Sequence, residues 1–184
     1  MKPTDELKKE HEAIKRMLKI MDKVCDRLDA RKNIEAGHLE NIVEFIQVFA
    51  DKCHHAKEED LLFPAMVASG IPNEGGPIAV MLIEHKKGRE FVKNVKNAVS
   101  GYRNGDAAAA SEISKNARGY VALLGSHIDK EDFILYPMAD KVLTTAKQSE
   151  LSKAFEKVEE DIIGHGKHEQ FHELLKRLEK IYLK

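Results

Sequence analysis

The sequence predicts an all-α fold, an up-down-up-down four-helix bundle with an additional C-terminal helix. Apolar residues recur at helical spacing along most of the chain, and the alternation typical of strands is hard to find. The segments between the predicted helices are short, which favours antiparallel neighbours. With 184 residues the chain is long enough for a substantial core. We expect one domain over residues 1–184, with the bundle at about 4–142 and the additional helix at about 149–183.

Each predicted helix of the bundle has a signal at its start or its end. The first begins at Thr4 or Asp5, either of which can cap it. The second spans about 34–68 and ends at the loop "SGIPNEGGP". Pro77 suits the first turn of the third helix, which ends at "SGYRNGD". Asp106 can cap the fourth helix, which we expect to run to about residue 142.

Composition excludes several classes of protein. A net charge of -1 gives no electrostatic footprint for nucleic acid or for an anionic membrane. The N-terminal segment lacks the apolar core of a secretory leader, and no apolar stretch approaches the ~18 residues of a membrane span. Cys25 and Cys53 should lie on the order of 20 Å apart along their helices, too far for a disulfide. We therefore expect a soluble, cytoplasmic protein.

One histidine pattern occurs twice in the chain. The stretches "HHAKEEDLLFP" (54–64) and "HIDKEDFILYP" (127–137) both fit His-x-x-x-Glu-acid-x-x-Leu-aromatic-Pro, and a Glu-His pair precedes each of them. One repeat is therefore a helical hairpin, and two hairpins make the bundle. The proline that ends each stretch lies late in its helix, where we expect it to kink or end that helix.

Six residues of this pattern are candidate metal ligands. A histidine and a glutamate four residues apart share one helix face, and helix bundles build dinuclear carboxylate sites from facing helices. In an antiparallel hairpin, two residues at the same level have residue numbers whose mean falls at the turn. For each successive pair of the four histidines, this mean falls at one of the three predicted turns. The histidines should thus form one layer of the core, where metal would satisfy them. The candidates are His11, His54, Glu58, His85, His127 and Glu131.

The neighbouring pair His55 and Glu59 is the alternative to His54 and Glu58. The two pairs differ by about 100° around an α-helix, and the helical neighbours of His55 are polar. We therefore expect His55, Glu59 and Asp60 on the outer, polar face of the helix. On this interpretation, alanine at His54 or Glu58 loses metal, while alanine at His55 or Glu59 largely retains it.

Other polar residues have less definite roles. Asp132 is expected as an outer-face acid. Glu10 and Glu84 either orient candidate histidines or form solvated salt bridges. Tyr120, two turns before His127, is a candidate hydrogen-bond donor to the site.

The remaining histidines lie away from the predicted layer. His165, His168 and His172 share one face of the last helix, where a surface or packing role is favoured over a second metal site. His38 is expected at the surface.

The motifs "KEHEAIKRML", "HHAKEEDLLFP", "EHKKGREFV" and "HIDKEDFILYP" together resemble those of the hemerythrin-like family, the HHE cation-binding domains. They cover roughly residues 5–142. The resemblance implies a non-haem di-iron centre for small diatomic or peroxide ligands, held by the six candidates. Oxygen-carrying hemerythrins have a second histidine where this chain has Arg89 and use an aspartate where it has Asp132. Because Glu131 fits the repeat better, the chain resembles the branch with four histidines and two glutamates.

The ligand set favours iron. Imidazoles and carboxylates without a thiolate differ from a structural zinc site, so zinc fits less well, and manganese is a further alternative. We expect two irons bridged by Glu58 and Glu131 and by an oxo or hydroxo group. The preferred function is binding of O2, NO or a related ligand for sensing, scavenging or storage. The alternatives are a di-iron enzyme that turns over peroxide or NO, and iron storage or delivery. The physiological ligand and the oligomeric state stay open.

Overall fold

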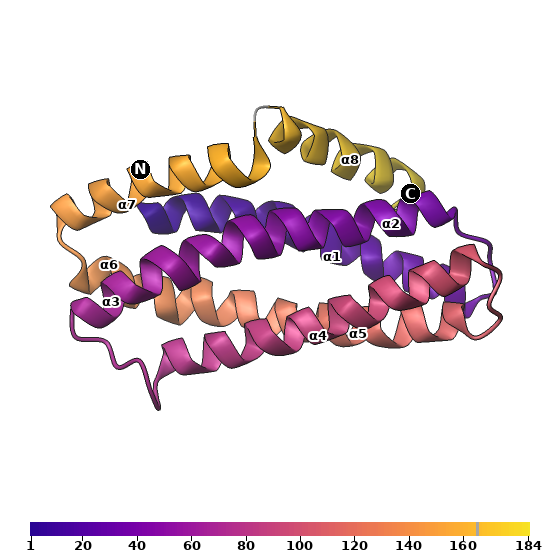
Figure 1. Ribbon diagram of the computed structural model, residues 1–184, viewed down its shortest axis with the longest axis horizontal. Helices are drawn as coiled ribbons and strands as arrows, with labels where there is room; N and C mark the ends of the chain where they lie inside the picture. The colour runs from indigo at the N-terminus through magenta and orange to yellow at the C-terminus, as the bar shows by residue number, and fades with distance from the viewer. Residues whose placement is uncertain (165) are drawn as a thin grey trace.

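The protein is a bundle of long helical rods covered on one side by further helices (Figure 1). The computed structural model describes residues 1–164 and 166–184, and within these ranges there is no strand. The predicted all-α bundle with an added C-terminal helical segment is therefore confirmed. Across the same ranges, no helix is both long enough and apolar enough to cross a membrane.

Four rods make up the bundle, and short loops connect them. The first rod is α1 (Pro3–Asp29) and the third is α4 (Pro77–Arg103). The second rod combines α2 (Ala36–Phe45), the π-helical segments η1 (Ile46–His55) and η2 (Lys57–Leu62), and α3 (Phe63–Ala68). The fourth combines α5 (Ala109–Lys130), the π-helical segment η3 (Glu131–Leu135) and α6 (Tyr136–Val142).

Pro64 and Pro137 do not end their rods, so of the two outcomes expected of them, a kink or an end, the end is wrong. Each lies in the first turn of the α-helical segment that follows a π-helical one. The π-helical segments η2 and η3 end two positions before these prolines, at Leu62 and Leu135, and their hydrogen bonds span five residues rather than four. The change of hydrogen-bond pattern therefore accommodates the missing proline N–H, and both rods continue.

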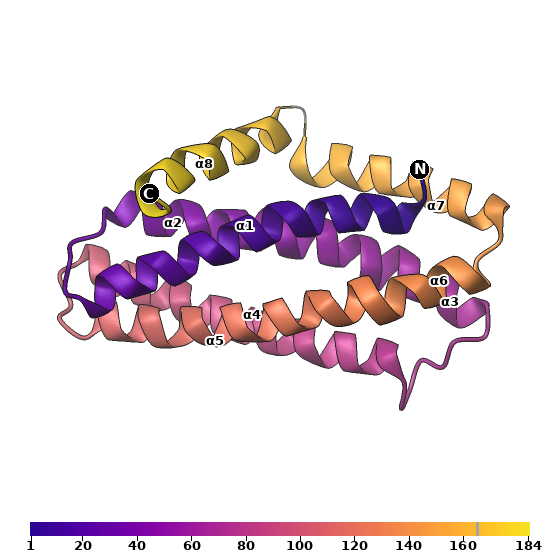
Figure 2. The same cartoon turned by 180° about the vertical axis from the view of Figure 1, so that it is seen from behind.

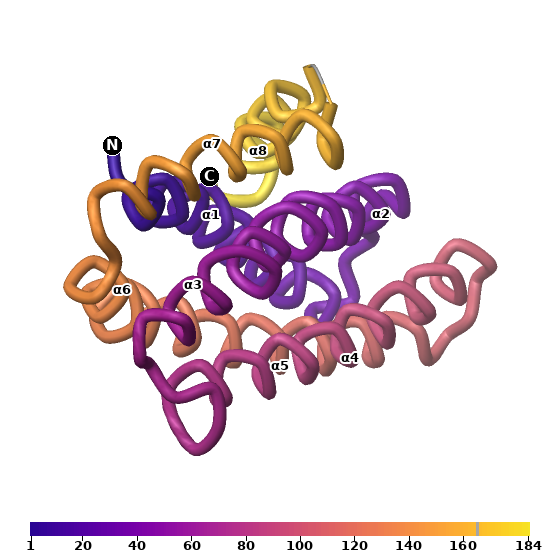
Figure 3. The backbone as a smooth tube through the Cα atoms, turned by 60° about the vertical axis from the view of Figure 1, so that its left-hand side comes forward, coloured from indigo at the N-terminus to yellow at the C-terminus, as the bar shows by residue number. Residues whose placement is uncertain are grey.

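The C-terminal segment, predicted as one helix, is divided in two. It consists of α7 (Thr145–Val158) with the π-helical segment η4 (Glu159–Ile163), followed by α8 (Lys167–Tyr182). Gly164 and Gly166 have φ values of 73° and 84°, a region that favours glycine and breaks the helix. Figures 2 and 3 show α7 and α8 lying against α1, on the side of the bundle away from α4 and α5.

The core has two apolar clusters separated by a polar layer. Along α1, Leu7 belongs to one cluster and the residues from Ala13 onward belong to the other, with His11 between them. The same order holds on α4, where Met81 and Val92 flank the layer. The bundle thus holds its ionisable side chains at one level, enclosed by apolar packing at both ends, where they need partners.

Candidate metal centre

The four rods bring the six predicted candidates into one buried cluster. Nε2 of His11 lies 3.0 Å from Nε2 of His54, and Nε2 of His85 lies 3.0 Å from Nε2 of His127. Each of the six candidate residues is at most 1% exposed. The structure therefore contains the predicted histidine layer, arranged as two facing pairs.

Two carboxylates lie between these histidine pairs. Oε1 of Glu131 is 2.9 Å from Nε2 of His127, and its Oε2 is 3.2 Å from Nε2 of His11. Oε2 of Glu58 lies 3.5 Å and 3.7 Å from the Nε2 atoms of the other two histidines, His85 and His54. Each carboxylate is thus close to one histidine of each pair, a placement suited to bridging two metal ions.

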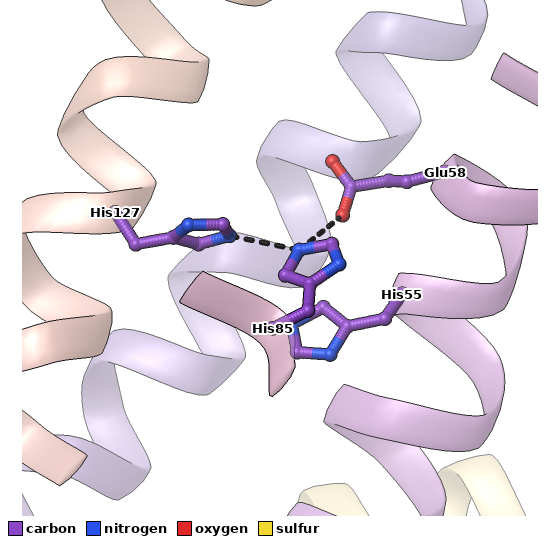
Figure 4. Close-up of side chains that lie close together, drawn as sticks. All are labelled: His55, Glu58, His85 and His127. Atoms are coloured by element: carbon purple, nitrogen blue, oxygen red, sulfur yellow. Dashed lines mark hydrogen bonds and ion pairs between the residues drawn. The ribbon is translucent and has the colours of Figure 1, made fainter. Parts of the chain in front are cut away.

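His55 also belongs to the cluster, so its predicted place on the outer face is wrong. It is only 4% exposed, and its ring stacks on that of His85 with centroids 3.9 Å apart (Figure 4). His55 ends the π-helical segment η1, in which each residue advances less around the axis than in an α-helix. His54 and His55 are therefore both directed inward, where an α-helical turn would separate them by about 100°.

The candidate ligand atoms fall into two groups, within each of which they lie within 4.8 Å of one another. One group has three imidazoles and the other has two. The groups are His55, Glu58, His85 and His127, and His11, His54 and Glu131.

Every imidazole of the cluster has its other nitrogen, Nδ1, against a carboxylate. Because an ionised carboxylate only accepts, Nδ1–H donates to it, which leaves Nε2 of each ring as the nitrogen that could bind metal. The hydrogen bonds run from His11 to Asp132 (2.7 Å), His54 to Glu10 (2.7 Å), His55 to Asp51 (3.3 Å), His85 to Glu59 (2.6 Å) and His127 to Glu84 (2.9 Å).

These contacts assign roles to acids that the sequence left undecided. Glu59 and Asp132, expected as outer-face acids, orient His85 and His11. Glu10 and Glu84 each orient a candidate histidine, one of the two alternatives, and each also forms an ion pair with a lysine. Each of these two acids serves a histidine of the neighbouring rod rather than the histidine next to it in sequence.

A cation holds each orienting carboxylate in turn. Arg89 donates to Asp51 and to Glu59, both at 2.8 Å, so one guanidinium supports the carboxylates of His55 and His85 together. The remaining pairs are Lys15 with Asp132 at 3.0 Å, Lys57 with Glu10 at 2.6 Å, and Lys130 with Glu84. The sequence comparison had identified Arg89 only as the place of an absent histidine.

Tyr136 is a site residue that the sequence interpretation missed. Its hydroxyl donates to Oε1 of Glu58 at 2.7 Å, and its ring stacks on His11 with centroids 5.5 Å apart. Phe63, the matching residue of the repeat, stacks on His85 at 6.1 Å without a hydroxyl. The aromatic-Pro end of the repeated motif was the available signal. Tyr120, the predicted donor, instead lines a pocket of about 450 Å³ beside His55.

The two carboxylates differ in their electrostatics. Burial and the charge of Glu131 raise the pKa of Glu58 well above its usual value. Burial would also raise the pKa of Glu131, but the imidazoles of His11 and His127 lower it well below that value. Burial lowers the pKa of His54 well below its usual value, so this imidazole stays neutral.

The cluster fits metal cations. Oε2 of Glu58 and both oxygens of Glu131 are buried and accept no well-formed hydrogen bond from the described residues. Buried acceptors without a donor are costly, and here they converge with imidazole lone pairs on the same space. Two cations, one in each ligand group, would satisfy both kinds of atom.

A third group of polar atoms does not suit a metal. Glu10, Cys53 and Glu159 also have ligand atoms within 4.8 Å of one another. The ammonium of Lys57 already lies 2.6 Å from both of these carboxylates. Burial raises the pKa of the Cys53 thiol to about 12, so it stays protonated. Cys25 and Cys53 are both free, which agrees with the predicted lack of a disulfide.

The other histidines serve packing among the described residues. His168 lies against Phe49 with ring centroids 5.5 Å apart and against His172 at 4.7 Å. His38 is half-buried rather than exposed and bonds the hydroxyl of Tyr182 at 2.8 Å. His165, the third histidine of the predicted face, lies outside the described residues.

Comparisons with known proteins agree with this geometry. The chain is similar to an uncharacterized protein of Mycobacterium bovis and to two of Mycobacterium tuberculosis, each 24% identical over 162 residues. The match covers 88% of this chain but 63% of each relative, so the chain spans less than two thirds of their length. No solved structure gives a significant match. The model of the hemerythrin HHE cation-binding domain matches residues 2–139, most of the chain, and the chain therefore belongs to that family.

Proposed function

We propose that this chain is a non-haem di-iron protein that binds O2, NO or a related small ligand at a two-metal centre in the bundle core. The observation that carries the proposal is the common orientation of five imidazoles. Each has Nδ1 against a carboxylate, which leaves Nε2 as the nitrogen available to a metal ion within the same buried cluster. Carboxylates that hold Nδ1 in this way are the usual partners of metal-bound histidines, because they fix the ring and raise the basicity of Nε2.

The ligand assignment follows from the two groups. One iron would be held by His55, His85 and His127, and the other by His11 and His54, with Glu58 and Glu131 shared between them. Imidazole and carboxylate donors without a thiolate suit iron better than structural zinc, although they also allow manganese. The metal identity, the number of ions and a cytoplasmic location stay predictions, as does the single-domain organisation.

The two groups differ in their number of imidazoles, and this difference favours binding of the small ligand at one of the two irons. The group with His11 and His54 has one imidazole fewer, which leaves more room for an external ligand at that iron. The Tyr136 hydroxyl, which contacts Glu58, is 3.3 Å from Nε2 of His11 and so lies on the same side. A ligand taken up there would be enclosed by residues that exclude water.

Turnover of peroxide or NO is the second candidate function, and Tyr136 favours it. Bound iron supplies the redox chemistry, but such turnover also needs protons. The hydroxyl of Tyr136 is a buried O–H donor next to the candidate bridge, and no counterpart stands at Phe63. Iron storage or delivery fits less well, because both candidate bridging carboxylates are 0% exposed and metal exchange through them would be slow.

Optical titration of the iron-loaded protein separates these functions. A reversible spectral change on adding and removing O2 or NO supports binding. Many turnovers with peroxide or NO, abolished in His54→Ala, support the enzyme. Ready transfer of iron to a weak chelator supports delivery. Metal-loaded protein that shows no spectral response to O2, NO or peroxide would contradict the proposal.

A further inference from the structure

Lys57 is a fully buried cation next to the candidate metal centre. Its side chain is 0% exposed, and its ammonium contacts three carboxylates, Glu6 at 2.8 Å, Glu10 at 2.6 Å and Glu159 at 2.6 Å. An ammonium has three N–H donors, so these acids satisfy all of them. Because a buried charge is costly unless fully paired, each of the three acids is needed.

This cluster leads directly to one candidate ligand. Oε1 of Glu10 accepts from Lys57, while its Oε2 accepts from Nδ1 of His54 at 2.7 Å. The position of the His54 ring therefore depends on Glu10, and the position of Glu10 depends on Lys57. Glu159, which also contacts the ammonium, completes a continuous chain of contacts from the C-terminal helices to the metal centre.

Glu159 comes from a segment beyond the family match, which ends at residue 139. It begins η4, directly after α7. The same layer contributes Phe155, whose ring centroid lies 5.5 Å from the Lys57 ammonium. The C-terminal layer thus covers Lys57 and supplies one of the three carboxylates that neutralise it.

The second half of the bundle provides an internal comparison. Lys130 holds the same place in the repeat as Lys57, and it pairs with Glu84, which orients His127. The Lys130 side chain is 34% exposed, so water reaches its ammonium, and Glu84 is its one acid partner among the described residues. The two halves of the centre therefore differ, and the half with His54 depends on the C-terminal layer.

We infer that Glu159 is a positioning residue for the iron held by His11 and His54, acting through Lys57 and Glu10. The inference rests on the proposed di-iron function. It assigns the C-terminal helical layer a part in holding the metal as well as in covering the bundle. Disturbing the contact should loosen one iron and leave the iron at His85 and His127 unchanged.

The test compares Glu159→Gln with Glu160→Gln in the full-length, iron-loaded protein. Glu160 is the neighbouring acid, is exposed and makes no ion pair with the described residues, so it controls for the change in charge. Iron release into a strong chelator and Mössbauer spectra are measured on both variants. Loss of a carboxylate that supports a metal-bound histidine typically costs 10–100-fold in affinity, and because Glu159 lies two contacts beyond that carboxylate we expect a smaller effect, about threefold to tenfold faster release.

The expected result is faster release of one of the two irons, with one of two Mössbauer signals altered, in Glu159→Gln but not in Glu160→Gln. A purely structural role would lower the free energy of unfolding in urea and leave both signals as in the wild type, which would overturn the inference. Equal acceleration of both irons would also overturn it. Wild-type protein that binds no metal would overturn the proposed function itself, and the inference with it.

Discussion

The rings of His55 and His85 stack with centroids 3.9 Å apart and planes inclined by 18°. The two histidines come from different rods, and the single side chain of Arg89 supports the carboxylates that orient both. His55 is thereby held in the group of candidate ligands that also contains His127. The group with His55 therefore has one imidazole more than the group with His11 and His54. This reverses the result that the sequence alone predicted for His55→Ala.

His55→Ala should weaken the binding of one metal ion by at least about tenfold. Removing a residue that only orients a ligand costs about that much, and His55 is itself a candidate ligand. The sequence alone predicted that this variant largely retains metal. Metal content after dialysis against a chelator measures the effect, with His172→Ala as a control because His172 lies on α8. Retention of both metals at wild-type strength would show that His55 is not a metal ligand.

Arg89→Met should also weaken the metal on the His55 side, because both orienting carboxylates lose their partner at once. Arg89→Lys should recover part of the loss, since an ammonium does not reproduce the fork geometry that reaches Asp51 and Glu59 together. Chelator competition provides the measurement. Arg103→Lys is the control, since Arg103 pairs with Glu40 in an exposed ion pair. If the Arg89→Met protein released metal no faster than this control protein, the ion pairs of Arg89 would have no part in metal binding.

Tyr136→Phe should keep both metals but remove the donor to Glu58. A buried acceptor without its donor costs roughly 1–3 kcal/mol, so the free energy of unfolding should fall by about that amount. If the protein turns over peroxide, the rate should fall as well. Tyr120→Phe is the matched control, because Tyr120 lines the pocket beside His55 rather than touching a candidate bridge. Equal effects of the two substitutions would show that the hydrogen bond from Tyr136 to Glu58 has no specific effect.

Metal binding should depend on pH because protons compete for the same nitrogens. Burial lowers the pKa of His11, but the nearby carboxylates of Asp132 and Glu131 raise it more, so the net pKa lies above its usual value. The balance is the same for His85, where Glu131 and Glu59 raise the pKa. A raised histidine pKa stabilises the metal-free fold below the unfolded value, and this contribution is lost as pH rises through the folded value.

The difference in Tm between metal-loaded and metal-free protein should therefore grow as pH rises from about 6 through these raised pKa values, because metal replaces the protons. Thermal unfolding of both forms across that range measures it. A Tm difference that stays constant with pH would show that no protons are displaced from the imidazoles.

The sequence was sufficient for the layer and its six candidates. The repeat placed His54 on His127, and the midpoints of successive histidines located His11 and His85 at the same level. Both signals depend only on helical period and turn position, which local sequence determines. The order of the rods and the apolar packing on both sides of the layer follow from the same information.

The other features of the site depend on details that a regular α-helix does not predict. The π-helical turn before Ala56 moves His55 inward, and an α-helical wheel places it outside. The pairing of Glu10 with His54 requires knowledge of which rods are adjacent and how their side chains cross. The motif comparison showed only that Arg89 replaces a histidine found in oxygen-carrying hemerythrins. It could not show that Arg89 contacts Asp51 and Glu59. Tyr136 was visible in the repeat, and the comparison with Phe63 would have identified it.

Metal analysis of anaerobically purified protein, combined with its absorption spectrum after exposure to air, tests the central claim most directly. The two groups of candidate ligands predict two irons per chain, with a charge-transfer band from an oxo-bridged pair. Double substitution of Glu58 and Glu131 by alanine should remove both. A single zinc per chain, or protein without metal that keeps its fold and stability, would contradict the di-iron account.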